Sequence, residues 1–286
     1  GNQNLYTLKA RFVLDAREAY DAEKDVKYDL PVSVSDEVTV RFGVREFKSD
    51  QSGKDGARKF YVNRRSIYIR GTNWIPEGML RQDDDRMEKE VRLTAESGVN
   101  MVRLWAGGIV ESDRFYELCD EYGLLVWQEF WMSGDTRMPQ DKSVYNSNVE
   151  STVKRIRNHP SIAIYVGRNE GNPPAVLDNA LSRIVKEYHP GIHYISHSAA
   201  GVVSGGGPYR ALPEKDYFGL SGSDRFHSER GMPNVMNYES IALTMKQDEM
   251  WPLNTSEHPN AAYGLHDYCL DSAMRCASFN NMISKA

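Results

Sequence analysis

The pattern of hydrophobic and polar positions divides the chain into two parts. Residues 6–14 and 32–42 largely alternate apolar with polar side chains. A period of two residues is typical of antiparallel strands with one exposed face. No convincing helical pattern separates the two segments. Residues 1–50 are therefore predicted to be the end of a β domain, followed by a turn or linker at 51–56.

From about residue 60 the pattern changes to short apolar runs that alternate with helical segments. Residues 60–71 are expected to form a hairpin that leads into a first buried strand. Further strands are expected at 101–105, 124–130, 162–167 and 192–196, with short candidates at 218–220 and 225–228, and helices at 83–97, 112–122, 144–158 and 175–187. This alternation predicts a parallel sheet, and the number of units favours an α/β fold of the TIM (β/α)8-barrel type over residues 51–286.

The end of the chain fits this barrel less well. A helix is expected at 268–285, but no eighth strand is evident. Either the barrel is truncated, or two strands have been read as one. A dinucleotide fold is disfavoured, because residues 71–76 lack the glycine fingerprint that would follow its first strand.

Composition narrows the classes of partner. The chain has 286 residues, of which 40% are hydrophobic and 26% charged, as is ordinary for a globular protein. A formal net charge of −5 gives no general attraction to nucleic acid or to an anionic membrane. No run approaches the ~18 apolar residues of a membrane span. The three cysteines lack metal-binding spacing and are expected to be packing residues.

Polar and aromatic residues gather where the predicted strands end. The carboxyl ends of parallel barrel strands meet at one mouth, where such enzymes keep their chemistry. The candidates in strand order are Asn73 and Trp74, Arg103 and Trp105, Glu129 and Trp131, Asn169 and Glu170, then His197, and finally His227 and Glu229. Carboxylates, an amide, an arginine and indoles together suit a sugar, because indole faces stack on pyranose rings.

Two carboxylates from separate strands are what glycoside cleavage requires. One is protonated and helps the leaving oxygen depart, and the other is ionised and attacks the anomeric carbon. Glu170 and Glu229 fit these roles. Arg103 could keep the nucleophile ionised, since a nearby cation lowers a carboxyl pKa. Glu129 could instead be the second carboxylate, or a partner of substrate or arginine, and Glu257 is a weaker competitor because no buried strand precedes it.

Each candidate also has a structural interpretation. Glu170 could cap or open the next helix, since acidic residues favour first turns. Arg103 could form a salt bridge in the barrel core. Trp105 and Trp131 could pack between strands and helices. The candidate histidines could be structural polar residues, and His197 and His227 alone do not supply the cluster that a metal-dependent hydrolase would need.

An ordered set of motifs carries a family resemblance. The motifs are Phe42–Phe47 (FGVREF), 60–63 (FYVN), 69–74 (IRGTNW), 100–105 (NMVRLW), 120–129 (DEYGLLVWQE), 159–162 (HPSI), 167–170 (GRNE) and 226–231 (FHSERG). In this order they resemble glycoside hydrolase family 2 over nearly the whole chain. The resemblance implies a retaining enzyme without cofactor or metal, with Glu170 as acid/base, Asn169 as the 2-hydroxyl contact and Glu229 as nucleophile. It also implies that residues 1–50 end an immunoglobulin-like domain.

Further segments resemble particular branches of that family. Residues 105–108 and 111–120 resemble the β-mannosidase branch, although that branch usually has Asp where Glu129 stands. Residues 169–174, 207–209 and 251–254 look closer to exo-β-glucosaminidases and endo-β-mannosidases, which adds Tyr209 to the substrate-binding candidates. The expected function is a retaining β-glycosidase acting on β-mannosides, with flanking domains as partners. The alternatives are another family 2 β-glycosidase and a truncated, non-catalytic sugar-binding barrel.

Overall fold

In the computed structural model the chain forms two compact units. The first contains residues 1–49 and 59–197, and the second contains residues 50–58 and 198–286. The residues that the structure describes are 3–14, 19–21, 26–28, 33–53, 56–76, 83–134, 138–200, 203–204, 226–229, 239 and 242–243. The elements predicted at 218–220 and 268–285, together with Tyr209 and Glu257, lie outside these ranges.

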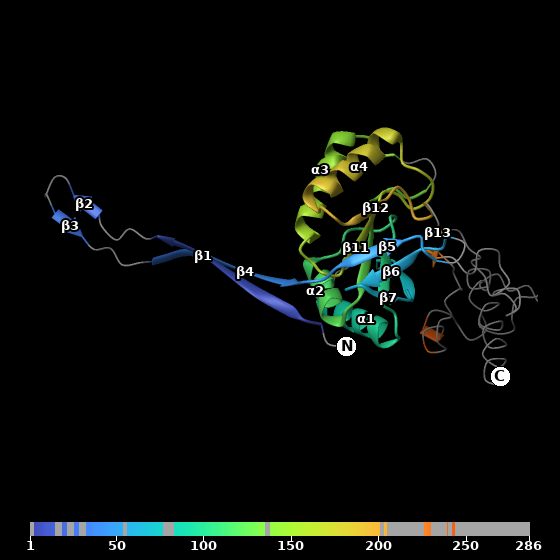
Figure 1. The fold of residues 1–286 in the computed structure, drawn as a ribbon, viewed down its shortest axis with the longest axis horizontal. Helices are drawn as coiled ribbons and strands as arrows, with labels where there is room; N and C mark the ends of the chain where they lie inside the picture. The colour runs from blue at the N-terminus through green and yellow to red at the C-terminus, as the bar shows by residue number, and fades with distance from the viewer. Residues whose placement is uncertain are drawn as a thin grey trace, which may run out of the picture. The chain divides into compact units, whose positions relative to one another are not determined.

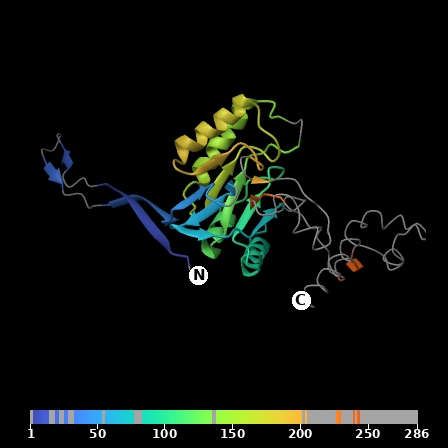
Figure 2. The ribbon, with the colours of Figure 1, turned by 45° about the vertical axis from the view of Figure 1, so that its right-hand side comes forward.

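The centre of the first unit is a five-stranded parallel sheet with helices packed along it (Figures 1 and 2). Its strands are β8 (Gly71–Trp74), β9 (Met101–Leu104), β10 (Leu125–Glu129), β11 (Ile162–Val166) and β12 (His193–Ile195). The helices are α1 (Asp84–Glu96), α2 (Asp113–Tyr122), α3 (Lys142–Ile156) and α4 (Ala175–Tyr188). The strands neighbour one another in chain order without the reversal of a doubly wound sheet, as in a barrel.

Local capping chemistry sets the helix boundaries. The Asp83 side chain accepts the Arg86 N–H at the start of α1, and Gly123 ends α2 with a left-handed φ of 73°. The sequence placed the third helix two residues too late at both ends. The Asp141 side chain accepts the backbone N–H groups of Ser143 and Val144, and this cap starts α3 at residue 142. No helix in the described ranges is long and apolar enough to cross a membrane.

Alternation along the strands separates two faces of the sheet. Val102, Leu104 and Val126 belong to the hydrophobic core that the sheet forms with helix residues such as Phe115 and Leu118. Residues between these positions must point to the opposite, inner face of the sheet. That face carries buried polar groups, among them Arg103 and Glu129.

The N-terminal residues form antiparallel β structure. β1 (Leu5–Leu14) pairs with β4 (Ser33–Gly43), and β2 (Ala19–Asp21) pairs with β3 (Val26–Tyr28). The two antiparallel strands that the alternation predicted are confirmed, and β2 and β3 were not predicted. β5 (Phe47–Asp50), β6 (Lys59–Val62) and β7 (Arg65–Ile67) form a three-stranded sheet, so the hairpin expected within 60–71 is present as β6 and β7.

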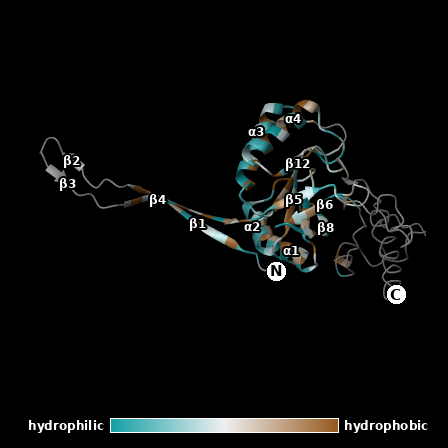
Figure 3. Ribbon diagram, viewed as in Figure 1, coloured by the Kyte–Doolittle hydropathy of each residue, from teal (hydrophilic) through white to brown (hydrophobic). Residues whose placement is uncertain are grey.

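One face of the β1/β4 pair is apolar and open. The pairs Tyr6–Phe42 and Leu8–Val40 share this face. Brown segments along β1 and β4 in Figure 3 mark hydrophobic residues of this pair of strands. Tyr6 is 51% exposed and Leu8 56% exposed. In a β-sandwich such a face packs against a second sheet. The assignment of residues 1–50 to the end of an immunoglobulin-like domain stays a prediction.

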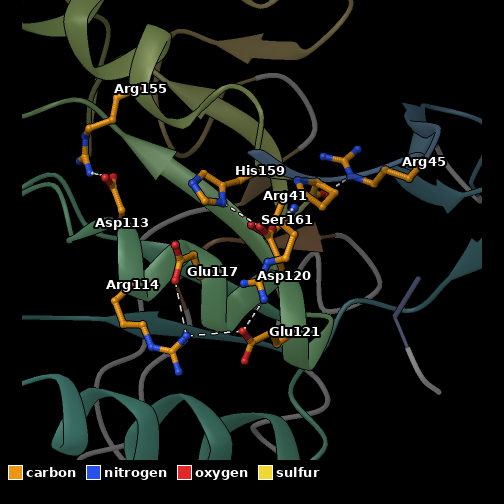
Figure 4. A network of polar contacts seen from close by, with 11 residues as sticks. Arg41, Arg45, Asp113, Arg114, Glu117, Asp120, Glu121, Arg155, His159 and Ser161 are labelled. Atoms are coloured by element: carbon orange, nitrogen blue, oxygen red, sulfur yellow. Dashed lines mark hydrogen bonds and ion pairs between the residues drawn. The ribbon is translucent and has the colours of Figure 1, made fainter. Parts of the chain in front are cut away.

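A polar network holds the start of β11 (Figure 4). The Arg45 guanidinium donates to the backbone carbonyls of Pro160 and Ile162. Asp120 of α2 accepts the Ser161 N–H at 2.9 Å, and its other oxygen lies 2.7 Å from Nδ1 of His159. Burial lowers the pKa of Arg45 to about 10, which Asp120 partly opposes. Arg45 and Asp120 therefore hold the backbone at residues 160–162, where β11 starts.

The Arg45→Met variant is expected to lose about 2 kcal/mol of stability, because two part-buried carbonyls lose a charged donor. For a unit of this size that corresponds to a fall in melting temperature of about 4–8 °C, measured by circular dichroism. Arg92→Met, on the solvent side of α1, is the matched control and should change stability by less than ~0.5 kcal/mol. Equal shifts in the two variants would contradict the role of Arg45.

Candidate active site

Glu129 is the centre of a buried polar cluster on the inner face of the sheet. It ends β10 and is 1% exposed. One carboxylate oxygen accepts Arg103 Nε at 2.6 Å and Trp127 Nε1 at 3.0 Å. The other accepts Arg103 Nη2 at 3.1 Å and the Ala106 N–H at 2.9 Å. Both oxygens of this carboxylate are thus engaged by the protein itself.

The electrostatics of this pair follow from its burial. Desolvation raises the pKa of the Glu129 carboxyl, and the Arg103 charge and hydrogen bonds, followed by the N–H groups of Ala106 and Trp127, oppose that rise. All four contacts come from donors, so they are complementary to the ionised carboxylate. The salt bridge in the barrel core that the sequence offered as an interpretation of Arg103 is present.

Arg103 also connects this cluster to Asn169. Its Nη2 donates to the side-chain carbonyl of Asn169. A guanidinium can only donate, so the amide oxygen must face it and the amide nitrogen is turned away. The Asn169 backbone N–H donates to the Met132 carbonyl at 3.0 Å, and the residue is 8% exposed. Both the position and the polarity of the Asn169 amide are therefore fixed.

Glu170 follows directly and lies on the surface, in a bend between β11 and α4. Gly171 next to it has a φ of +69°, a left-handed conformation that glycine adopts without strain. Helix α4 begins at Ala175 with Pro174 at its N-cap position. Glu170 therefore neither caps this helix nor lies in its first turn, so the structural interpretation from sequence does not apply.

The candidates at the end of β8 point to opposite faces. Asn73 and Trp74 are the last two residues of this strand, whereas the sequence placed them at or just after the end of an earlier strand. Asn73 is paired in register with Arg103 of the inner face. The Trp74 indole packs on Phe115 of α2 with ring centroids 4.9 Å apart, and its N–H donates to Glu111 at 2.9 Å. Burial raises the pKa of this Glu111 carboxyl, and the bond from Trp74 opposes the rise.

The other two indole candidates are half-buried in loops. Trp105 follows β9, and its ring covers Gly107 so closely that a Cβ there would lie 2.0 Å from the indole. Any side chain at position 107 would therefore displace the Trp105 ring from this position. Trp131 follows β10 and meets Phe130 and Tyr145 edge to face, which places it against the core. Much of the Trp131 side chain is therefore packed against the core, as the structural interpretation predicted.

The remaining candidates lie in different parts of the chain. His197 follows β12, and burial lowers its pKa, with Asp178 opposing the shift and Arg168 adding to it. The second unit contains β14 (Phe226–His227), a short strand where the sequence predicted 225–228, paired with β13 (Val203–Ser204), which was not predicted. Glu229 lies two residues after the end of β14 and is 7% exposed.

Comparison with known proteins places this chain in a family. Residues 54–204, more than half of the chain, match the family model described as "Glycosyl hydrolases family 2, TIM barrel domain". The chain belongs to glycosyl hydrolase family 2. The α/β TIM-barrel fold predicted from the sequence is thereby confirmed, and so is the family resemblance.

Three family 2 relatives illustrate the likeness. The chain is 37% identical over 180 residues to a mannosylglycoprotein endo-β-mannosidase of Lilium longiflorum, covering 59% of this chain and 18% of that protein. It is 27% identical over 249 residues to an exo-β-D-glucosaminidase of Streptomyces avermitilis, covering 79% and 27%. A crystal structure of a β-D-mannosidase from Dictyoglomus thermophilum superposes with a TM-score of 0.66 at 25% identity, covering 96% and 35%. The chain thus spans about a fifth to a third of these family 2 proteins.

Sequence reasoning missed three buried side chains of the candidate site, Trp127, Glu111 and Arg168. Trp127 stands two residues before Glu129, and a strand period of two places both on one face, so this signal was available. Glu111 and Arg168 lie in irregular segments whose contacts have no periodic signal. Among the residues that the structure describes, no group of three His, Cys, Asp or Glu side chains is arranged to hold a metal ion.

Proposed function

We propose that this chain supplies the catalytic machinery of a retaining β-glycosidase that acts on β-mannosides. The observation that supports it most is the arrangement at the end of β11: Asn169, fixed by Arg103, stands beside the exposed carboxyl of Glu170. The family supplies the reaction class, and the mannosidases among the relatives support the choice of sugar.

In the proposed reaction Glu229 attacks the anomeric carbon while protonated Glu170 gives its proton to the departing glycosidic oxygen. The sugar is then held as an ester on Glu229. Water attacks the same carbon, Glu170 takes up the proton, and the Glu229 carboxylate is released. The turned-out amide nitrogen of Asn169 donates to the 2-hydroxyl of the sugar. Arg103 and Glu129 act behind Asn169 rather than on the sugar.

We assign the other side chains predicted for the site to substrate contact or to support of the substrate-binding loops. Trp105 provides an apolar surface for a sugar ring, and His197 stays neutral at neutral pH and bonds a hydroxyl. Asn73, Trp131 and Tyr209 complete the proposed set of substrate contacts, with Trp74 supporting the loop that bears Trp105 through Glu111. No cofactor and no metal take part.

The proposal extends to the N-terminal segment. The apolar face of β1 and β4 supports the assignment of residues 1–50 to the end of an immunoglobulin-like domain, in which a second sheet would cover that face. Such a flanking domain is the protein partner that we propose, beside the glycoside substrate.

The direct test is to trap the ester with a 2-deoxy-2-fluoro-β-mannosyl fluoride. The protein mass should rise by one fluoromannosyl group, and peptide mapping should place the group on Glu229. Glu229→Ala should gain no mass, and Glu257→Ala should be labelled like the unaltered protein. A label on Glu257, or no turnover of aryl β-mannosides, glucosaminides, galactosides and glucuronides, would refute the proposal. The same aryl panel separates mannosidase from glucosaminidase activity.

A further inference from the structure

We propose that Arg168 is a positioning residue, which holds the bend carrying Glu170 in place for proton transfer. The inference rests on the proposed function and deepens it. Arg168 is 7% exposed and lies between β11 and Glu170. Its Nη2 donates to the Gly134 carbonyl at 2.6 Å, and its Nη1 donates to the Asn172 carbonyl at 3.2 Å.

These two bonds join separate loops. Gly134 belongs to the loop after β10, and Asn172 lies on the far side of the bend that contains Glu170. The Asn169 N–H, which donates to the Met132 carbonyl, is a second bond between the same two loops. Arg168 therefore closes the bend on itself and fastens it to the neighbouring loop, with Glu170 projecting from the fastened segment.

The first residue of the bend, Gly167, is also held against β12. The Gly167 N–H donates to the Ile195 carbonyl of β12 at 2.9 Å. A Cβ at Gly167 would lie 2.5 Å from the Tyr194 hydroxyl and 2.7 Å from the Ser196 carbonyl. Gly167 is thus joined to β12 by its backbone and has no space for a side chain, and the Arg168 guanidinium fastens the residues that follow it up to Asn172.

Packing alone does not explain an arginine at this position. An apolar side chain would fill the space without removing a charge from water, which costs free energy. Moreover, Arg168 Nε is buried without a hydrogen-bond partner among the described residues. What the guanidinium adds is a planar fork that reaches two carbonyls at once. The influence of its charge on His197 agrees with a place near the end of β12.

The chemical consequence falls on one step. A general acid must come within about 2.6–3.2 Å of the atom that it protonates. A shift of about 1 Å in a catalytic group can cost roughly 100-fold in rate. Loosening the bend therefore slows protonation of the leaving oxygen, and it spares substrates whose leaving group needs no proton.

The test compares two leaving groups in Arg168→Met. The kcat/KM for 4-methylumbelliferyl β-mannoside should fall about 10- to 100-fold, while that for 2,4-dinitrophenyl β-mannoside should change less than about threefold. Arg168→Lys, which keeps the charge but not the fork, should lie between Arg168→Met and the unaltered protein. Arg155→Met is the matched control, because Arg155 also donates to a loop carbonyl, that of Glu111. It should affect both substrates equally.

Equal losses on the two substrates in Arg168→Met, or no loss on either, would overturn the inference. Hydrogen exchange provides a readout that needs no activity. Amides at 132–134 and 167–172 should exchange at least tenfold faster in Arg168→Met and at unchanged rates in Arg155→Met. Unchanged exchange in Arg168→Met would also overturn it. If the unaltered protein cleaves no glycoside, the proposed function fails, and the exchange result alone decides whether Arg168 fastens the bend.

Discussion

Changing Arg103 to methionine is expected to destabilise the first unit by roughly 3–5 kcal/mol, the usual cost of removing one member of a buried ion pair. The Glu129 carboxylate would remain buried with its cation gone, and Asn169 would lose the donor that fixes its amide. In thermal unfolding this corresponds to a fall in melting temperature of roughly 6–20 °C for a unit of this size. Circular dichroism or denaturant titration would measure it.

A double variant separates the cost of a stranded charge from the value of the pair. Arg103→Met combined with Glu129→Leu removes both charges, and it should be more stable than Arg103→Met alone by roughly 3 kcal/mol or more, because replacing a whole buried pair with apolar side chains is often neutral or stabilising. Both variants should be inactive, because Asn169 lacks its Arg103 partner in each of them. If the double variant is no more stable than the single one, the pair does not behave as a buried ion pair.

Replacing Glu170 with alanine is expected to lower kcat/KM on 4-methylumbelliferyl β-mannoside by about 100- to 10,000-fold, the range for loss of a general acid–base group. Azide should restore turnover and yield β-mannosyl azide, because an anion that needs no deprotonation can attack the sugar ester in place of water. The product would be identified by NMR, and its β configuration would report retention.

Glu187→Ala is the control for that experiment, since Glu187 is an exposed carboxylate on α4. It should retain full activity and give no azide product. Glu170 would not be the acid/base of a retaining reaction if Glu170→Ala kept most of its activity on 4-methylumbelliferyl β-mannoside, or if it gave the α-azide.

Much of the βα order was predictable because its signals are local. Apolar runs bounded by turn residues placed β10 and β11, and Gly123 marked the end of α2. The start of α3 was misplaced because its signal is a single side-chain cap, Asp141, just before an otherwise polar stretch. The predicted helix began instead at Val144, the first apolar residue of that segment.

The candidate site was predictable in composition but not in contacts. A strand period of two means that a small error in where β8 lies changes which residues share a face. Asn73 and Trp74 were expected together beyond the strand, yet inside it they point to opposite sides. Three of the four hydrogen bonds to Glu129 come from β9 and its loop, which no local pattern of β10 can reveal.

The hydrogen bonds from Arg45 to the start of β11 limit where a chimeric protein can be joined. Arg45 comes from the segment before the predicted boundary at residue 50, yet its hydrogen bonds end on the strand that leads to Glu170. Gly43 packs closely on the same segment, since a Cβ at this position would lie 2.8 Å from the Pro160 ring. A chimera joined at residue 50 would exchange Arg45 but keep the carbonyls that it serves. A junction ahead of residue 43 keeps both halves of the contact from one parent.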